Sequence, residues 1–306
     1  RDPLWSRGLG DVYKRQINIE SYGEFERIAK ISEQLNKSVN CALRVNPDIA
    51  IGSHKYIETG SKTSKFGLDS EAVNKISDEA RDNKFVNIAS VACHIGSQIS
   101  DENLILKSLD VICEIADNLS LNGHAIKFLD IGGGLGIQYK DEKEGDPGIL
   151  MAGVKNRLAG KEYKIILEPG RSIIGSAGIL VTRIEYIKNA GGKKFAIIDA
   201  GMNDLIRPSL YEAWHEVKEL ENKEISSDTY DLAGPVCETG DILAKGRNLK
   251  ILPNDFVAFM DVGAYGSVMS SNYNSRLKPM ELLVTGNEIE VIRRKETFED
   301  LIALES

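Results

Sequence analysis

The stretch that indicates the fold most clearly is residues 128–136, which read FLDIGGGLG. Phe128–Ile131 has the pattern of a short buried strand, and Gly132-Gly133-Gly134 follows it at once. Glycines at the end of a strand permit a tight turn, and they let backbone N–H groups approach a bound anion closely. A following helix would add the positive end of its dipole. The glycines alone favour a phosphate site and a simple turn equally. The stretch lacks the Gly-Lys-Ser/Thr of a Walker A loop and the downstream acid of a dinucleotide fingerprint.

The segments around this stretch alternate between strand and helix patterns. Apolar residues three and four apart predict helices over 22–35 and 71–80 and after Ser100, a suitable N-cap. This alternation predicts parallel strands joined by crossover helices. The further strands are expected at Ile17–Glu20, Val39–Val45, Val86–Ile95 and Lys164–Leu167.

Polar and glycine residues fall at or just past the C-terminal ends of these predicted strands. An α/β barrel builds its active site at that end, and an open doubly wound sheet binds ligands there too, so both folds stay open at this point. The residues concerned are Asn46, His94, Ser97, Gly132, Gly133, Gly134, Glu168 and Arg171.

The second half of the chain has a different pattern. Strands follow one another there, which predicts a mostly β domain over 172–306 behind an α/β domain over 17–171. Thr285-Gly286-Asn287 suits a hairpin turn. The predicted strands are Leu180–Tyr186, Lys194–Asp199, Phe256–Met260, Leu282–Val284 and Glu288–Ile292.

Residues 1–16, RDPLWSRGLGDVYKRQ, show neither a strand nor a helix period. Asp11–Gln16 resembles the translation of a transposase end sequence used in preparing sequencing libraries. We therefore expect a non-native segment and exclude it from the fold. A natural flexible N-terminus is the alternative. With the first interpretation, the native chain is an N-terminally truncated fragment that starts near Ile17.

The composition is that of a soluble, cytoplasmic globular protein, with 42% hydrophobic and 27% charged residues. A net charge of −8 without a basic block argues against nucleic-acid binding. No apolar run is long enough to span a bilayer. The four cysteines form no CxxC pair, so we expect neither a disulfide framework nor a metal site.

Two strand ends of the α/β half carry side chains that could bind a ligand or take part in a reaction. His94 is by itself more often structural, although its ring can stack on an aromatic cofactor, and the hydroxyl of Ser97 can bind phosphate. Glu168 and Arg171 form either a local ion pair or two separate devices. In the second case, the carboxylate keeps a pyridine nitrogen protonated and the guanidinium clamps a carboxylate.

Three further groups lie in the β half. Arg207, followed by Pro208 and by Tyr211, suits a second carboxylate clamp. Cys237 stands beside Glu238 in a glycine-bracketed loop, where a thiol can supply a proton. Tyr265 lies between glycines and could reach a phosphate or a substrate.

Taken together, these motifs resemble the diaminopimelate decarboxylases, which belong to the fold-type III decarboxylases dependent on pyridoxal 5'-phosphate. Eight motifs occur in the family's order, from about Ile17 to the end of the chain. They are Arg44-Val45-Asn46-Pro47, Ser64-Lys65-Phe66-Gly67, His94-Ile95-Gly96-Ser97, Gly132-Gly133-Gly134, Glu168-Pro169-Gly170-Arg171, Arg207-Pro208-Ser209-Leu210-Tyr211, Cys237-Glu238-Thr239-Gly240-Asp241 and Gly263-Ala264-Tyr265-Gly266.

The resemblance implies a partial (β/α)8 barrel of the alanine-racemase type, a C-terminal β domain and a homodimer with shared active sites. His94 would stack on the cofactor ring, and Cys237 would donate a proton from the partner subunit. The other cofactor-binding residues would be Ser97, Gly133, Gly134, Glu168, Pro169, Gly170, Arg171 and Tyr265. The substrate would be held by Arg171, Arg207, Tyr211, Glu238 and Tyr265.

The implied reaction is decarboxylation of meso-diaminopimelate to L-lysine, the last step of bacterial lysine synthesis. The chain departs from the family in one respect, because the Schiff-base lysine of a Tyr-Ala-x-Lys-Ala-Asn-type motif is missing. Lys14, Lys62 and Lys65 stand in other contexts. We therefore expect the fragment to be inactive or nearly so. A decarboxylase acting on ornithine, arginine or carboxynorspermidine and a non-catalytic homologue remain the alternatives.

Overall fold

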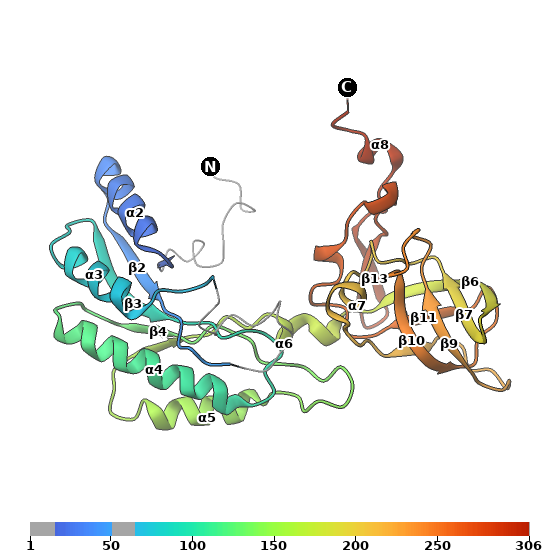
Figure 1. Cartoon of the computed structure of the whole chain (residues 1–306), viewed down its shortest axis with the longest axis horizontal. Helices are drawn as coiled ribbons and strands as arrows, with labels where there is room; N and C mark the ends of the chain where they lie inside the picture. Colours follow the sequence, from blue (N-terminus) through green and yellow to red (C-terminus); the bar gives the residue numbers. More distant parts are fainter. Residues whose placement is uncertain (1–15, 51–64, 306) are drawn as a thin grey trace. The chain divides into compact units, whose positions relative to one another are not determined.

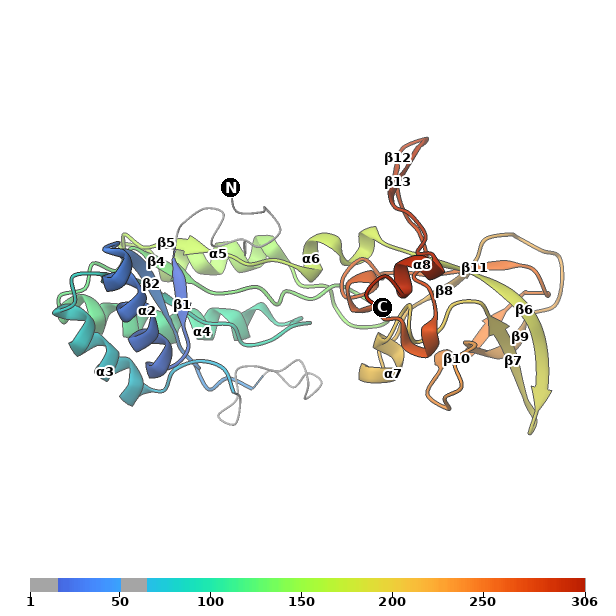
Figure 2. The same cartoon turned by 90° about the horizontal axis from the view of Figure 1, so that it is seen from above.

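The computed structural model describes residues 16–50 and 65–305, so the expected non-native segment lies outside the described residues except for Gln16. The chain divides into two compact units. The α/β unit comprises the residues up to Ile137 together with Lys143–Ser172, and the β unit comprises Gln138–Glu142 and the residues from Ile173 onward. Figures 1 and 2 together label their elements.

The α/β unit is built on a five-stranded sheet whose neighbouring strands are all parallel. The strands follow one another in chain order, β1 to β5, without the reversal that defines a doubly wound sheet. This order is that of a barrel and settles the alternative left open by the sequence. The elements are β1 (Ile17–Ile19), α2 (Tyr22–Leu35), β2 (Val39–Arg44), α3 (Ser70–Arg81), β3 (Val86–Ala92), α4 (Glu102–Leu121), β4 (Phe128–Asp130), α5 (Pro147–Arg157), β5 (Lys164–Ile166) and α6 (Arg171–Ile174).

Alternate residues of each strand serve the two faces of this sheet. Cys41 and Leu43 of β2 and Leu129 of β4 pack with the helices into one buried core. Residues of opposite parity, such as Arg44 and Asp130, belong to the other face. Figures 1 and 2 show the helices lying along one side of the sheet. The period of two therefore separates the apolar core from a polar face at the strand ends.

Three local expectations differ from the structure. Asp101, not Ser100, is the N-cap of α4, since its carboxylate accepts a hydrogen bond from the backbone N–H of Asn103. No helix follows the glycines directly, because the next helix, α5, begins only at Pro147. The turn therefore gains no helix dipole from that side. Helix α5 was itself not expected, and Asp146 caps it through Gly148 and Ile149.

The β unit contains a six-stranded, mostly antiparallel sheet in the order β10-β9-β7-β6-β11-β8, with β7 and β9 parallel. The predicted strands are present, but β8, β9 and β10 were not expected. Strands β12 and β13 form a separate hairpin around Gly286. The elements are β6 (Leu180–Ala190), β7 (Lys193–Ile198), α7 (Arg207–Tyr211), β8 (Val217–Glu219), β9 (Asp228–Ala233), β10 (Ile242–Leu249), β11 (Phe256–Phe259), β12 (Glu281–Thr285), β13 (Glu288–Arg293) and α8 (Phe298–Leu301).

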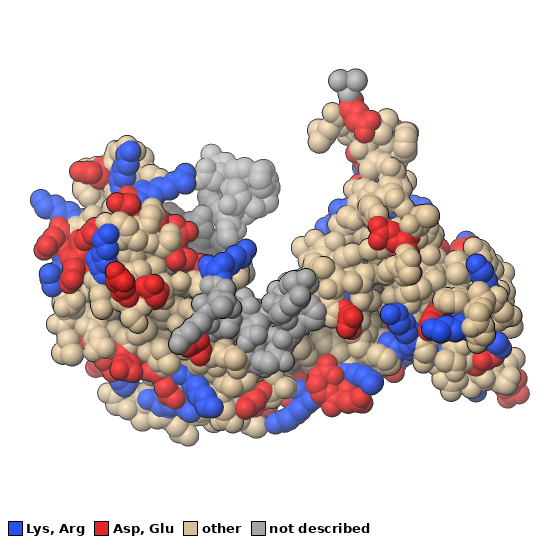
Figure 3. Space-filling model, in the orientation of Figure 1, with Lys and Arg blue, Asp and Glu red and all other residues tan. Residues whose placement is uncertain are grey.

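The β unit has a core of its own, in which Ile184, Ile198, Leu232, Val257 and Phe259 are almost fully buried. Figure 3 shows basic and acidic side chains interspersed on the visible face of each unit. Among the described residues, no helix is both long and apolar enough to cross a membrane.

Candidate active site

The glycine turn after β4 is packed so tightly that side chains are excluded from it. A Cβ added at Gly133 would collide with the carbonyl oxygen of Glu168, and one at Gly134 would collide with that of Gly96. Gly132 and Gly134 also have φ of +66° and +96°, which favour glycine. The ends of β3, β4 and β5 thus meet backbone to backbone, and we call this arrangement the glycine cradle.

His94 is held against the glycine cradle as a neutral ring. The backbone N–H of Gly133 donates to Nδ1 of His94 at 3.3 Å, so the ring proton of the neutral form is on Nε2. Burial, followed by the positive charge of Arg44, lowers the pKa of His94. A neutral, partly exposed ring at a strand end is suited to lie flat against an aromatic ligand.

Arg171 and Ser97 are direct neighbours. Nε of Arg171 donates to Oγ of Ser97 at 3.2 Å, and the arginine is 6% exposed at the start of α6. The pair places a cation and a hydroxyl together in the α/β unit, which also holds the cradle. A hydroxyl beside a guanidinium is typical of an anion site.

Glu168, Pro169 and Gly170 form the exposed link between β5 and α6. The backbone N–H of Glu168 donates to the carbonyl of Gly132 at 2.8 Å, which joins this link to the cradle. A Cβ at Gly170 would meet no atom within 4 Å, so this glycine, unlike Gly133, is not required by packing.

Asp130 was not singled out from the sequence, yet it is one of the most buried charged residues, at 3% exposure. Its carboxylate accepts a hydrogen bond from the backbone N–H of Gly132 at 2.9 Å. Burial, and then the charge of Glu168, raises the pKa of Asp130 to about 7. The sequence feature that could have indicated Asp130 is its place in FLDIGGG, where strand alternation puts its carboxylate on the opposite face of the sheet from Leu129. The hydrogen bond to Gly132 ties Asp130 to the cradle.

Arg44 is also placed by a partner that the sequence did not reveal. Its Nη1 donates to Glu20 at 2.6 Å, and the backbone N–H of Gly67 donates to the other carboxylate oxygen at 3.4 Å. Glu20 follows β1, so it connects the ends of the first two strands with the segment near Gly67. Ser64 of the Ser-Lys-Phe-Gly motif lies outside the described residues.

Arg207 and Tyr211 stand at the two ends of the short helix α7 in the β unit. The Arg207 side chain is buried, with Nη1 2.9 Å from Nε2 of His215 and Cζ 4.8 Å from the ring centroid of Tyr139. His215 and Tyr139 were not recognised in the sequence, because nothing local to Arg207 points to either residue. Tyr211 is half-buried.

The loop that carries Cys237 and Glu238 is organised by a buried carboxylate. Asp241 accepts hydrogen bonds from the backbone N–H groups of Met202 at 2.6 Å and Val236 at 2.7 Å. Burial raises the pKa of Asp241. Ser209 of α7 donates to the carbonyl of Gly240 at 2.7 Å, which ties the loop to α7. We call α7 and residues 234–241 together the clamp.

Within the clamp, Cys237 and Glu238 are exposed, whereas Cys41, Cys93 and Cys113 are buried, as expected. The hydroxyl of Tyr273 donates to the carboxylate of Glu238, and this bond raises the pKa of Tyr273. The structure thus brings Glu238 to a partner that the sequence did not indicate.

Tyr265 is 42% exposed and has a φ of +59°, which is uncommon for an aromatic residue. The preceding turn is compact, because a Cβ at Gly263 would collide with the carbonyl oxygen of Ile174. Strained backbone of this kind is found preferentially at functional sites.

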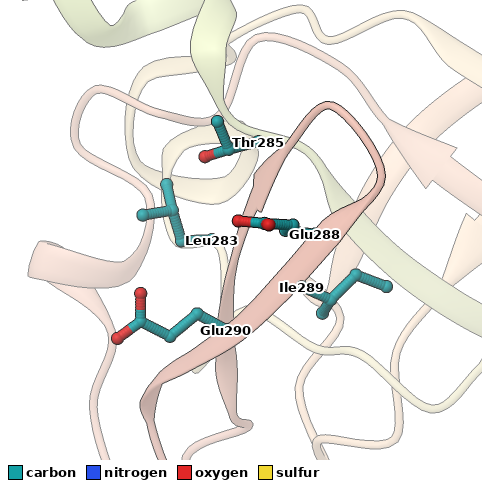
Figure 4. A pocket seen from close by; sticks show the side chains of 5 residues that line it. All are labelled: Leu283, Thr285, Glu288, Ile289 and Glu290. Atoms are coloured by element: carbon teal, nitrogen blue, oxygen red, sulfur yellow. The ribbon is translucent and has the colours of Figure 1, made fainter.

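A hollow of about 380 Å³ lies on the β12–β13 hairpin and contains none of the predicted site residues. Figure 4 shows its lining, which is Leu283, Thr285, Glu288, Ile289 and Glu290. No group of three or more His, Cys, Asp or Glu side chains suited to a metal ion occurs within residues 16–50 and 65–305.

Comparison with known proteins gives consistent matches. The family described as "Pyridoxal-dependent decarboxylase, pyridoxal binding domain" matches residues 7–175. A diaminopimelate decarboxylase of Pseudomonas aeruginosa is 43% identical over 290 residues, which cover 95% of this chain and 70% of that protein. One of Neisseria meningitidis serogroup B is 41% identical, covering 94% of this chain and 70% of the relative.

Solved structures agree. The crystal structure of diaminopimelate decarboxylase from Helicobacter pylori complexed with L-lysine has a TM-score of 0.91 at 39% identity, and the match covers 95% of this chain and 73% of that chain. An arginine decarboxylase of Paramecium bursaria Chlorella virus has a TM-score of 0.72 at 18% identity, covering 84% and 68%, and shares the fold.

Proposed function

Since the chain belongs to the diaminopimelate decarboxylase family of pyridoxal-phosphate-dependent decarboxylases, we propose that its reaction is the decarboxylation of meso-diaminopimelate to L-lysine. The glycine cradle is the observation that carries this proposal. At neighbouring strand ends, this backbone-lined turn lies with a neutral imidazole that can stack on a ring and a carboxylate that can pair with a protonated ring nitrogen. These are the groups that a phosphorylated pyridine requires.

The residues of the α/β unit fit pyridoxal phosphate. The cradle is lined without side chains, because a Cβ at each of its three glycines would collide with neighbouring atoms. The backbone N–H groups of Gly132 and Gly133 already donate to Asp130 and His94, so the Ser97 hydroxyl beside Arg171 is the proposed donor to the phosphate. His94 offers a flat neutral face, and Glu168 offers a carboxylate to hold a pyridine nitrogen protonated. When bound, the cofactor supplies an electron sink for the bond that releases CO2. Tyr265 is proposed to reach both cofactor and substrate.

For Arg171, the sequence left roles toward cofactor and substrate open. Its hydrogen bond to Ser97, the other residue expected at the phosphate, favours the cofactor phosphate. Pro169 and Gly170 then act by carrying the chain from Glu168 to Arg171.

The clamp is proposed to recognise the substrate. Arg207 and Tyr211 would bind the carboxylate at the unreacted end, and Glu238 would bind its amine. The exposed thiol of Cys237 would return a proton to the carbon that loses CO2. We further propose a homodimer with shared active sites, in which Cys237 and the adjacent Glu238 of one protomer complete the site that contains Arg207 and Tyr211 of the other protomer. Residues 1–306 contain no Tyr-Ala-x-Lys-Ala-Asn-type segment, and we therefore propose that this chain alone is inactive or nearly so.

The test is a substrate panel with protein expressed from its complete reading frame and loaded with pyridoxal phosphate. CO2 release is measured with meso-diaminopimelate, ornithine, arginine and carboxynorspermidine at equal concentration. We expect turnover of meso-diaminopimelate at least about 100 times that of each other substrate, because an unmatched polar site rejects them. Preference for another substrate would replace the proposed specificity. No turnover of any substrate would indicate a non-catalytic homologue.

A further inference from the structure

We propose that His215 is a positioning residue that fixes the Arg207 guanidinium for the carboxylate at the unreacted end of the substrate. This inference rests on the function proposed above and adds a residue that no sequence motif indicated. It is carried by the contacts of a fully buried imidazole, which is 0% exposed.

The hydrogen bonds of His215 determine its protonation state. Nδ1 lies 2.8 Å from the carbonyl oxygen of Met260, which can only accept, so Nδ1 carries the proton. Nε2 lies 2.9 Å from Nη1 of Arg207, which can only donate. Both bonds are therefore satisfied together only by a neutral ring with its proton on Nδ1. In that state, His215 offers Arg207 an acceptor at a fixed position.

The ring is anchored to the sheet of the β unit. His215 comes just before β8 and Met260 just after β11, and these strands pair with Val217 opposite Phe259. The backbone N–H of Met260 also donates to the carbonyl of Glu216 at 2.9 Å. The buried Arg247 donates through Nη2 to the carbonyl of His215 at 2.9 Å. The acceptor therefore lies directly beside the paired strands β8 and β11 and is tied to them by these hydrogen bonds.

A second contact fixes Arg207 from another side. Its guanidinium lies 4.8 Å from the Tyr139 ring centroid, and the Tyr139 and His215 rings meet edge to face at 5.5 Å. A planar guanidinium held over an aromatic ring and by a hydrogen bond loses little further freedom on binding a carboxylate. Such preorganisation strengthens binding of a carboxylate and leaves binding of an amine unaffected.

The chemistry of the reaction provides ligands that separate these two effects. Decarboxylation of one end of meso-diaminopimelate leaves a single carboxylate in L-lysine, which is that of the unreacted end. L-Lysine therefore carries the group that Arg207 would bind. 1,5-Diaminopentane has the same chain and both amines but lacks the carboxylate.

The experiment measures binding of these two ligands by calorimetry with cofactor-loaded protein from the complete reading frame. His215→Phe keeps the ring shape and removes the acceptor. We expect it to weaken L-lysine about tenfold, the scale of a hydrogen bond to a charged group, and to change 1,5-diaminopentane less than about twofold. KM for meso-diaminopimelate should rise by about the same factor, while kcat stays within about threefold. Equal weakening of both ligands, or of neither, would overturn the proposal.

Two further variants distinguish positioning from a general structural effect. His215→Gln places an amide oxygen near the position of Nε2 and should recover most of the L-lysine affinity. In an Arg207→Met background, His215→Phe should cause no further loss, because residues that act through one another are not additive. An additive loss contradicts the proposal. Unsubstituted protein that neither binds L-lysine nor releases CO2 would overturn the proposed function as well, whereas an active protein with unchanged His215→Phe affinity overturns this inference alone.

Discussion

The glycine cradle and the clamp are built in opposite ways. The cradle is made of backbone, with the ends of β3, β4 and β5 in such close contact that a Cβ at Gly133 finds no space. The clamp is made of side chains on a short helix and a loop. Asp241 accepts a hydrogen bond from the backbone N–H of Val236 in this loop, and Ser209 of the helix donates one to the carbonyl of Gly240. A backbone-built cradle suits a cofactor that the whole family shares, and a clamp built of side chains suits a particular substrate.

The contrast also shows where each site is vulnerable. Backbone donors cannot be changed by substituting a single side chain, but any added atom obstructs them. Side-chain donors can be exchanged without altering the backbone, so specificity can change while the cofactor site is kept. Substitutions in the cradle should therefore affect cofactor binding, and those in the clamp should affect substrate recognition and turnover.

The largest effect is expected for Gly133→Ala, whose Cβ would collide with the carbonyl of Glu168. We expect pyridoxal phosphate affinity to fall roughly 1,000-fold, about 4 kcal/mol. The measurement is a cofactor titration followed by absorbance. Gly23→Ala is the matched control, because a Cβ at Gly23 meets no atom within 4 Å in helix α2. Unchanged affinity in Gly133→Ala would contradict a backbone-built cradle.

The next largest effect is expected for the pH dependence of the unfolding free energy, through Asp130. Its pKa is raised to about 7 in the folded protein, so folding favours the protonated form. The associated stability is complete below about pH 4 and is lost as the pH rises to about 7, with a change on the order of 3 kcal/mol. Asp130→Asn keeps an acceptor for Gly132 but cannot ionise.

Denaturant titrations from pH 4 to 8 check this prediction. The unfolding free energy of the unsubstituted protein should fall over this range relative to that of Asp130→Asn. We compare the two proteins because the contributions of all other titrating groups cancel in the difference. Parallel pH profiles for the two proteins would show that folding does not raise the pKa of Asp130.

Cys237→Ala tests the clamp at the chemical step. Loss of a positioned proton donor should lower kcat for meso-diaminopimelate about 100-fold, while cofactor affinity is unchanged. Steady-state kinetics and cofactor titration together measure this. Cys113→Ala is the control, because Cys113 is buried in the helical core of the α/β unit. A kcat within about twofold of the unsubstituted protein would exclude Cys237 as the donor.

The smallest effect is expected for Tyr273→Phe, which removes the hydroxyl that donates to Glu238. Because this pair is exposed, KM for meso-diaminopimelate should rise only about fivefold, with kcat nearly unchanged. Tyr186→Phe, an exposed tyrosine of β6, is the control and should leave KM as it is. A matching rise of KM in both variants would show that Tyr273 does not support Glu238 in substrate binding.

The sequence indicates the places of the cradle residues more directly than the contacts that hold the clamp, for a physical reason. Gly132–Gly134 and His94 are found by their places after strands, which depends on local pattern alone. Asp130 was missed, although strand alternation places it on the opposite face from the core residue Leu129 and therefore on the polar face. His215 contacts Arg207 only because β8 pairs with β11, and β8 has a single buried residue, Val217, to indicate a strand.

Unexpected strands and caps have similar causes. In β10, the register shifts around Gly246 interrupt the alternation on which strand prediction depends. Ser100 and Asp101 are adjacent and both suitable as N-caps, so only the structure distinguishes them.

The most direct test of the account is the reaction in D2O, with protein expressed from its complete reading frame and supplied with pyridoxal phosphate. If the cradle binds the cofactor and the clamp returns a solvent-exchangeable proton, each CO2 released from meso-diaminopimelate should be accompanied by one L-lysine. That lysine should carry a single non-exchangeable deuterium on the carbon that lost CO2. Mass spectrometry and CO2 release measure both products. A cofactor-loaded protein that releases no CO2, or that yields lysine without the deuterium, would contradict the account.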